Sequence, residues 1–122
     1  MKNILLIDDD LGFLKTLEEE LSSYKENWNI LTAENGKQGV GIIASHPVDL
    51  VVTDLRMPVM DGYELLAFLR EMRPTMPIIV MTADDSREAH QRLRSLGVEK
   101  CISKPCQFSE IVRAISSSSR IS

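Results

Sequence analysis

Short, unbroken runs of apolar residues recur along this chain, and they constrain its fold more than any other feature. Three runs are clear, at residues 4–7, 50–52 and 78–81, and each is bounded by polar residues, Gly or Pro. Weaker versions occur at residues 30–31 and 101–102. Apolar runs without alternation are typical of strands that are buried on both faces. The pattern therefore predicts a sheet that is covered on both sides.

Segments with helical spacing separate these runs. Their apolar residues recur every three or four positions: Leu11, Leu14, Leu17 and Leu21; Val40 and Ile43; Leu65, Leu66, Leu69 and Met72; Ala89, Leu93 and Leu96; Phe108, Ile111, Val112 and Ile115. Each set forms an apolar stripe along one face of a helix. A strand followed by a helix, repeated five times, predicts an α/β fold. We expect a five-stranded, parallel, doubly wound sheet with right-handed crossovers and helices on both faces.

Residues that favour helix starts precede several of these segments. They are Asp10 before the first helix, Asp61 before the third, and Asp84, Asp85 or Ser86 before the fourth. Side-chain oxygens at such positions accept hydrogen bonds from free backbone N–H groups. The second helix is the least defined, because Gly36, Gly39 and Gly41 crowd a short segment. An interior Gly costs about 1 kcal/mol relative to Ala.

A length of 122 residues favours one compact domain. We predict a domain over residues 1–116 and a flexible, Ser-rich tail or linker stub over residues 117–122. The net charge of −4 argues against direct binding to nucleic acid, because such binding needs a basic face.

The sequence predicts neither secretion nor a membrane segment. The apolar run at residues 4–7 is followed by three aspartates, so it is too short for a signal sequence or a spanning helix. Cys101 and Cys106 do not form a CxxC pair, and they support neither a disulfide framework nor a zinc site. We therefore predict a cytoplasmic location with reduced thiols and no membrane partner.

Polar residues follow four of the predicted strands at the point where each strand ends. They are Asp8 and Asp9 after the first strand, Asp54 after the third, Thr82 after the fourth, where Ala83 follows it, and Ser103 and Lys104 after the fifth, where Pro105 follows them. In an open parallel sheet, ligands bind at the carboxyl ends of the strands. We therefore expect three carboxylates, a hydroxyl and an ammonium group to converge at one edge.

The carboxylates of Asp8, Asp9 and Asp54 would crowd one another if the first and third strands are neighbours, because adjacent strands lie about 4.8 Å apart. Two unit charges about 4 Å apart repel by roughly 4 kcal/mol at an effective dielectric constant near 20. Ligands that are all oxygens favour Mg²⁺ as the neutralising cation, with Lys104 as a second positive charge. A carboxylate can itself accept a phosphoryl group as an acyl phosphate, and Asp54 on the central strand is the best candidate.

Four motifs together resemble the response-regulator receiver domain. They are Asp8 and Asp9, residues 53–58 with residues 60–62, residues 81–83, and Lys104 with Pro105. The resemblance covers nearly the whole chain, and the spacing of four separate motifs makes it specific. It implies a flavodoxin-like sheet with strand order 2-1-3-4-5.

The resemblance also implies a role for each acidic residue. Asp54 is similar to the phosphoacceptor of the family. Asp9 and Asp54 would be direct Mg²⁺ ligands, the Arg56 backbone carbonyl would be a third, and Asp8 would reach the ion largely through water.

Residues on the fourth and fifth strands complete the implied site. Thr82 is similar to the hydroxyl residue that moves toward the phosphoryl oxygens, and Ala83 begins the loop that follows it. Lys104 is similar to the ammonium group that pairs with these oxygens. The bond between Lys104 and Pro105 resembles the family's cis peptide bond.

The sequence departs from the family at the positions that read out the phosphorylated state. The family usually has an aromatic residue three positions before the lysine, where this chain has Cys101, and commonly Phe where it has Cys106. A thiol cannot make the same rotamer change, so the usual coupling to Thr82 is in doubt. Arg56 and Asp84 occupy two variable positions that tune phosphoryl lifetime in the family, and a salt bridge between them is conceivable.

The function that the resemblance implies is a phosphorylation-dependent switch of a two-component system. A histidine kinase or a histidine phosphotransfer protein would be the phosphodonor, and the output partner is unknown. A homodimer through the fourth helix, fifth strand and fifth helix is a further partner that it allows. The domain would catalyse its own phosphorylation and slow dephosphorylation without being a turnover enzyme.

Two alternatives remain open from the sequence. One is a pseudo-receiver that is not phosphorylated and serves only for docking or dimerisation. The other is a phosphohydrolase with an aspartate nucleophile. Such an enzyme would need a second acid two residues beyond Asp54, where this chain has Arg56.

Overall fold

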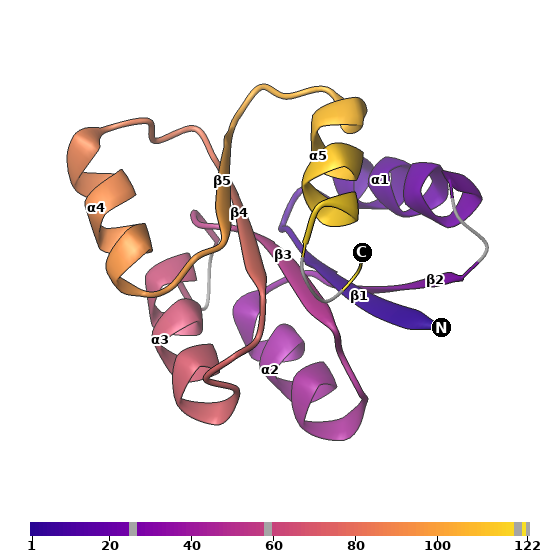
Figure 1. The fold of residues 1–122 in the computed structure, drawn as a ribbon, viewed down its shortest axis with the longest axis horizontal. Helices are drawn as coiled ribbons and strands as arrows, with labels where there is room; N and C mark the ends of the chain where they lie inside the picture. Colours follow the sequence, from indigo (N-terminus) through magenta and orange to yellow (C-terminus); the bar gives the residue numbers. More distant parts are fainter. Residues whose placement is uncertain (25–26, 58–59, 119–120, 122) are drawn as a thin grey trace.

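The computed structural model describes residues 1–24, 27–57, 60–118 and 121. Strands and helices alternate along the chain (Figure 1). Their bounds are β1 (Lys2–Ile7), α1 (Leu11–Tyr24), β2 (Trp28–Ala33), α2 (Gly36–Ser45), β3 (Leu50–Asp54), α3 (Gly62–Met72), β4 (Ile78–Thr82), α4 (Arg87–Ser95), β5 (Lys100–Ser103) and α5 (Phe108–Ser116). The alternation predicted from the apolar pattern is therefore confirmed.

The strands form one parallel sheet with the order β2-β1-β3-β4-β5, as predicted. Ile7 on β1 pairs with Thr53 on β3, and Asp54 pairs with Met81 on β4. Thr82 pairs with Ser103 on β5. This register brings the carboxyl ends of β1, β3, β4 and β5 to one edge, where the chain changes from strand to loop.

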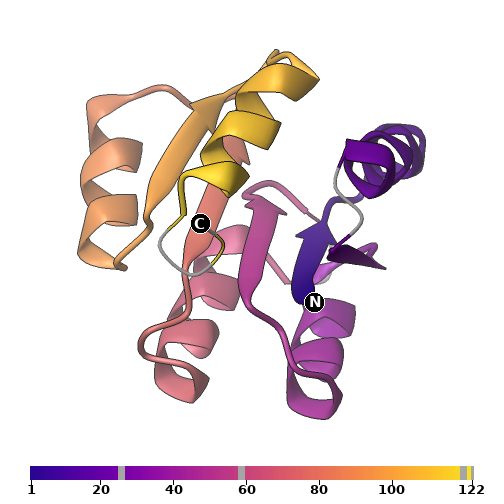
Figure 2. The same cartoon turned by 45° about the vertical axis from the view of Figure 1, so that its right-hand side comes forward.

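Two separate hydrophobic cores flank the sheet, because neighbouring residues of each strand point to opposite faces. On β1, Leu5 and Ile7 belong to the core beneath α2, α3 and α4, whereas Ile4 and Leu6 belong to the core beneath α1 and α5. Figures 1 and 2 show α1 and α5 together on one side of the sheet and the other helices on the opposite side. This arrangement explains why the strands are apolar throughout.

The glycines of α2 do not prevent the helix, although they made it the least defined element in the sequence. Gly39 is buried against β1, and a Cβ atom there would lie 2.5 Å from Ile7 Cδ1. Gly39 therefore allows the helix to approach the sheet closely. Asn35 precedes the helix, and its side chain accepts a hydrogen bond from the backbone N–H of Gln38.

The predicted helix starts are confirmed at three positions. Asp10 Oδ1 accepts a hydrogen bond from Phe13 N at 3.1 Å, and Asp61 Oδ1 accepts one from Glu64 N at 3.0 Å. Of the three candidates before α4, Ser86 is the cap, because its Oγ accepts a hydrogen bond from Ala89 N.

The first residues of the Ser-rich segment lie against the domain. Ser118 is fully buried, and its Oγ donates a hydrogen bond to Glu99 Oε2 at 3.1 Å. Lys100 Nζ donates to Ser117 Oγ at 2.8 Å. Ile121 packs against the core beneath α1 and α5. The boundary at residue 116 and the flexible tail over residues 117–122 stay predictions, and residues 119, 120 and 122 lie outside the described residues.

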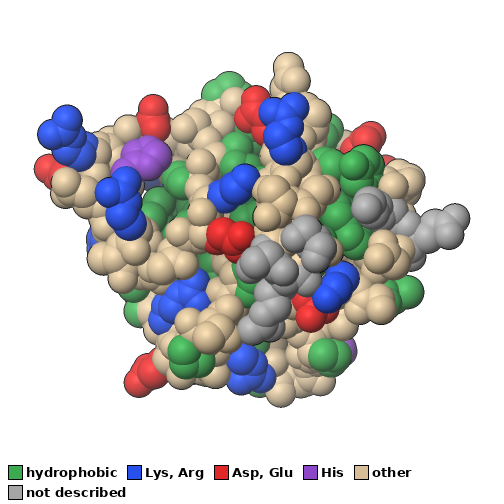
Figure 3. Space-filling model, in the orientation of Figure 1, with side chains coloured by type: hydrophobic (Ala, Val, Ile, Leu, Met, Phe, Trp, Pro, Cys, Tyr) green, Lys and Arg blue, Asp and Glu red, His purple; other side chains and the backbone are tan. Residues whose placement is uncertain are grey.

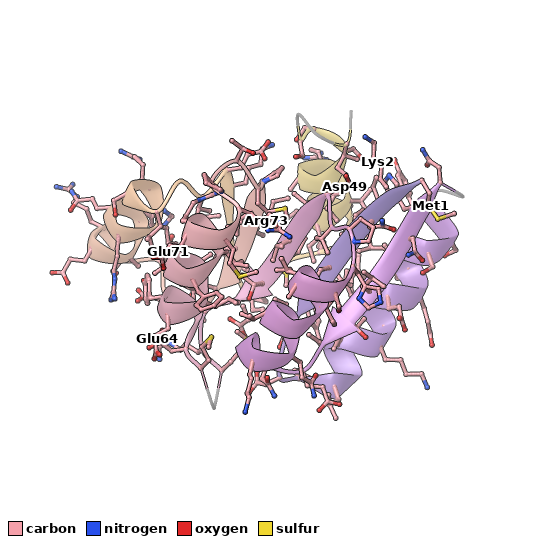
Figure 4. All side chains as sticks on the ribbon, turned by 90° about the horizontal axis from the view of Figure 1, so that it is seen from below. Met1, Lys2, Asp49, Glu64, Glu71 and Arg73 are labelled. Carbon is pink, nitrogen blue, oxygen red and sulfur yellow. The ribbon has the colours of Figure 1, made fainter. Side chains whose placement is uncertain are left out.

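At the opposite edge of the sheet, where the strands begin, a hydrogen bond between a side chain and the backbone joins two strands. Asp49 Oδ2 accepts a hydrogen bond from Asn3 N at 2.8 Å, which ties the start of β3 to β1. Figure 4, viewed from below, shows Asp49 beside Lys2. None of the helices in the described part of the chain combines the length and apolar character needed to cross a membrane.

Candidate functional site

Three carboxylates meet at the carboxyl ends of β1 and β3. Asp8, Asp9 and Asp54 each offer one oxygen atom, and these atoms all lie within 4.8 Å of one another. Asp8 is 1% exposed and Asp54 is 9% exposed, whereas Asp9 faces solvent. The convergence that the sequence predicted from its motifs is therefore present. Oxygen-only ligands at this spacing form a group that can hold a hard divalent cation.

Backbone N–H groups orient the two buried carboxylates. Asp54 Oδ1 accepts hydrogen bonds from Leu55 N at 2.7 Å and Arg56 N at 3.4 Å. Asp8 Oδ1 accepts one from Asp10 N at 2.9 Å. One oxygen of each carboxylate is thus fixed by its own loop, and the Oδ2 atoms of both residues are directed toward the same ammonium group.

That ammonium group belongs to Lys104, which follows β5. Its Nζ donates to Asp8 Oδ2 at 3.0 Å and to Asp54 Oδ2 at 3.2 Å. The backbone is fixed at the same residue, since Lys104 N donates to Thr82 O at 2.8 Å. Burial by itself lowers the pKa of Lys104, but the hydrogen bond to Asp8 and the charges of Asp54 and Asp8 together outweigh it. The pKa of Lys104 is therefore raised above its ordinary value.

Replacing Lys104 tests how much this ammonium group stabilises the acidic cluster. We expect Lys104→Met to lower the free energy of unfolding by about 2 kcal/mol without divalent cations, because buried carboxylates lose their partner. The pKa is raised, so the contribution of Lys104 is fully present below about pH 10.4 and is lost as the pH rises through the raised pKa. Urea unfolding at pH 7 and at a series of alkaline pH values measures this. The difference in stability between the two proteins should shrink as the pH rises through the raised pKa of Lys104, and equal stability at pH 7 would contradict the prediction.

Thr82 ends β4, the strand between β3 and β5, and Ala83 follows it. Thr82 is buried, and its Oγ1 accepts a hydrogen bond from Asp84 N at 3.0 Å. Ala83 is exposed and lines a hollow of about 460 Å³ together with Lys104, Pro105 and three further residues: Asp10, Phe13 and Cys106. The peptide bond between Lys104 and Pro105 is cis.

Arg56 and Asp84 flank the site without forming the salt bridge that the sequence left conceivable. Within the described residues, the ion pairs closer than 4.0 Å join Lys104 to Asp8 and Asp54, and His90 to Asp85. The pKa of Asp84 is lowered, chiefly by hydrogen bonds from Ser86, with a smaller contribution from the charge of Arg56. Arg56 therefore acts on Asp84 at longer range.

Cys101 lies on β5. Close to it, sequence reasoning missed a set of polar contacts in which Asp85 joins α4 to β5. Asp85 Oδ1 is 2.8 Å from His90 Nε2 on α4, and it accepts a hydrogen bond from Ser103 Oγ on β5 at 3.3 Å. The hydrogen bond with His90 is the main cause of the lowered pKa of Asp85. Burial raises the pKa of the Cys101 thiol, which keeps it protonated at neutral pH.

The ring of Phe13 is a second feature that sequence reasoning missed. Its centroid lies 4.9 Å from Lys104 Nζ. Phe13 lies four residues before Leu17, on the apolar side of α1, but nothing in the local sequence indicates that its ring would meet Lys104. Figure 3 shows charged side chains of both signs across the face that is presented in Figure 1.

The chain matches a known protein family over most of its length. The sequence model of the response regulator receiver domain matches residues 4–116. The chain therefore belongs to the response regulator receiver domain family. The sheet order and the α/β layers agree with this assignment.

Relatives of different kinds share this domain. The chain is 38% identical over 113 residues to the transcriptional regulatory protein GlrR of Escherichia coli, covering 93% of this chain and 25% of that protein. It is 31% identical to the sensor histidine kinase RcsC of Escherichia coli, covering 92% of this chain and 12% of that protein. It is 32% identical to sporulation initiation phosphotransferase F of Bacillus subtilis, covering 93% and 90%.

Solved structures agree with the sequence relatives. The receiver domain of HemR from Leptospira biflexa, in its non-phosphorylated form, superimposes with a TM-score of 0.87 at 27% identity, covering 95% of this chain and 92% of that one. The chemotaxis protein CheY4 of Vibrio cholerae shares the fold with a TM-score of 0.88 at 22% identity, covering 95% and 97%. The chain spans only a quarter or less of GlrR and RcsC.

Proposed function

We propose that this receiver domain accepts a phosphoryl group on Asp54 and changes conformation in response. The observation that carries the proposal is the geometry of Lys104, whose Nζ contacts both Asp8 Oδ2 and Asp54 Oδ2. Phosphoryl transfer depends mainly on positioning and on neutralising charge. A buried carboxylate beside an ammonium group and an acidic cation site meets both requirements.

Each residue has a defined part in the proposed transfer. An oxygen of Asp54 forms a bond to phosphorus while the P–N bond of a phosphohistidine donor breaks, and the electron pair of that bond stays on the departing imidazole. Lys104 neutralises the phosphoryl oxygens. Leu55 N holds Asp54 Oδ1 at 2.7 Å, which fixes the orientation of the carboxylate before a donor arrives.

A divalent cation completes the proposed site, and the donor set fits Mg²⁺. Asp9, Asp54 and the backbone carbonyl of Arg56 would hold it, with Asp8 contributing through water. When bound, the ion neutralises the acidic cluster and the phosphoryl oxygens. Asp9 is exposed, so it faces the solvent from which such an ion would enter.

The added phosphoryl group would act as a switch through its charge. It carries nearly two negative charges at neutral pH and attracts Lys104 and the hydroxyl of Thr82. Movement of Thr82 Oγ1 would break its hydrogen bond with Asp84 N and so release the loop over residues 83–86. The output surface would be the face of α4, β5 and α5, which could also form a homodimer.

The proposed phosphodonor is a histidine kinase or a histidine phosphotransfer protein. Support comes from the relatives, which include a sensor histidine kinase and a sporulation phosphotransferase. A cytoplasmic location, suited to such a partner, remains a prediction from the sequence.

Direct phosphorylation tests the proposed function. The protein is incubated with Mg²⁺ and acetyl phosphate or phosphoramidate, and its intact mass is then measured. We expect one added phosphoryl group that is released by hydroxylamine and that maps to the peptide containing Asp54. EDTA should prevent its formation. A protein that binds Mg²⁺ but gains no adduct with either donor would instead favour the docking module.

A further inference from the structure

We propose that Phe13 is a positioning residue that holds Lys104 against the phosphoacceptor; this inference rests on the proposed function. The centroid of the Phe13 ring is 4.9 Å from Lys104 Nζ. An ammonium group within about 6 Å of a ring centroid is attracted to the face of the ring. Asp8 and Asp54 contact the same nitrogen at 3.0 and 3.2 Å, so the ring is a third partner for Lys104.

The ring of Phe13 is itself held in place. It stacks on Phe108, the first residue of α5, with centroids 6.0 Å apart and planes inclined by 17°. Both rings are half-buried and pack against the core beneath α1 and α5. A ring that is held by a second ring and by the core can in turn hold the ammonium group beside it.

The contact with Phe13 differs from the two ion pairs because it does not use a carboxylate of the acidic site. A lysine side chain has a flexible four-carbon stem, and ordering it costs entropy. A cation or a phosphoryl group at the acidic site would compete with Lys104 for the oxygens of Asp8 and Asp54. The Phe13 ring is not a ligand of either group, so it can keep the ammonium group near Asp54 while the oxygen contacts change.

A contact of this kind also joins three elements that are far apart in the sequence. Phe13 belongs to α1, Lys104 follows β5, and Phe108 begins α5. The hollow beside the ring is lined by Lys104, Pro105 and Cys106 among others, so the ammonium group remains open to a small phosphodonor. The ring therefore positions Lys104 without closing the site.

Aromatic and aliphatic substitutions of Phe13 distinguish positioning from simple packing. Phe13→Leu keeps an apolar side chain and removes the ring face, whereas Phe13→Trp keeps a ring face. We expect the phosphorylation rate at saturating phosphoramidate to fall about three- to tenfold in Phe13→Leu and to be largely retained in Phe13→Trp. Phe68→Leu is the matched control, because Phe68 is 42% exposed on α3 and lies outside the site.

Two further measurements do not depend on phosphorylation. In NMR spectra, the ring should shift the Lys104 ε-methylene protons upfield in the wild type and in Phe13→Trp but not in Phe13→Leu. In urea unfolding, Phe13→Leu and Lys104→Met should show a coupling equivalent to a three- to tenfold change in the unfolding equilibrium constant.

The outcomes separate this inference from the proposed function. If the wild type is not phosphorylated, the proposed function fails. If the NMR shift and the coupling are still found in that case, the contact between Phe13 and Lys104 is structural only, and its role in positioning for transfer is overturned. If the wild type is phosphorylated and Phe13→Leu and Phe13→Trp lose activity equally, positioning by the ring face is overturned. Additive effects of Phe13→Leu and Lys104→Met on stability would also overturn it.

Discussion

Asp54→Asn is expected to abolish phosphorylation and, at the same time, to make the cation-free protein more stable. The amide cannot form the acyl phosphate, so the rate of adduct formation should fall by more than about a hundredfold. The substitution removes two repulsive charge pairs, with Asp8 and Asp9, and one attractive pair, with Lys104. We therefore expect the free energy of unfolding in EDTA to rise by about 1 kcal/mol.

Asp9→Asn is the matched control for this prediction. It removes charge from the same cluster but keeps the carboxylate of the acceptor. We expect it to raise stability in EDTA by a smaller amount, because Asp9 is exposed. It should also weaken Mg²⁺ binding while a slow, Asp54-dependent adduct still forms. Intact mass and urea unfolding measure both effects, and an adduct of normal yield on Asp54→Asn would reject Asp54 as the acceptor.

The second large effect is expected for Gly62→Ala at the start of α3. A Cβ atom on Gly62 would clash with Leu55 Cα and would lie 2.7 Å from Leu55 O, so the backbone of the loop after β3 would have to move. Gly62 N also donates a hydrogen bond to Leu55 O at 2.7 Å. We expect Gly62→Ala to lower the free energy of unfolding by about 3 kcal/mol.

A displacement of Leu55 should also disturb the acidic site. Leu55 N donates a hydrogen bond to Asp54 Oδ1, and Arg56 is the next residue after Leu55. We therefore expect Mg²⁺ affinity, measured by calorimetry, to fall in Gly62→Ala. Gly41→Ala is the control. It has no atom within 4 Å of the new Cβ and lies inside α2, so it should raise stability by up to about 1 kcal/mol. A destabilisation of the same size in both variants would show that the clash at Leu55 is not the cause.

The elements that could be predicted from the sequence are those that follow from the pattern of apolar residues along the backbone. The runs at residues 4–7, 50–52 and 78–81 became β1, β3 and β4, because a strand buried on both faces must be apolar throughout. The same sheet geometry placed Asp8, Asp54 and Lys104 together, since carboxyl ends of parallel strands share one edge.

The unpredicted part depends on contacts between side chains that are distant in the sequence. The contact of Phe13 with Lys104 requires the docking of α1 beside the loop after β5, which no local pattern encodes. The link from Asp85 to His90 and Ser103 likewise depends on how α4 sits beside β5. The hydrogen bonds of Ser117 with Lys100 and of Ser118 with Glu99 also join residues that are distant in the sequence.

The division of each strand between two cores has a consequence for how this sequence can change. A substitution alters one side chain, but deleting Leu50 at the start of β3 would turn every following side chain of that strand to the other layer. Val51 and Val52 would exchange cores, and Asp54 would leave the edge that it shares with Asp8. Strand length should therefore be under stricter selection than strand composition, with insertions and deletions confined to the loops.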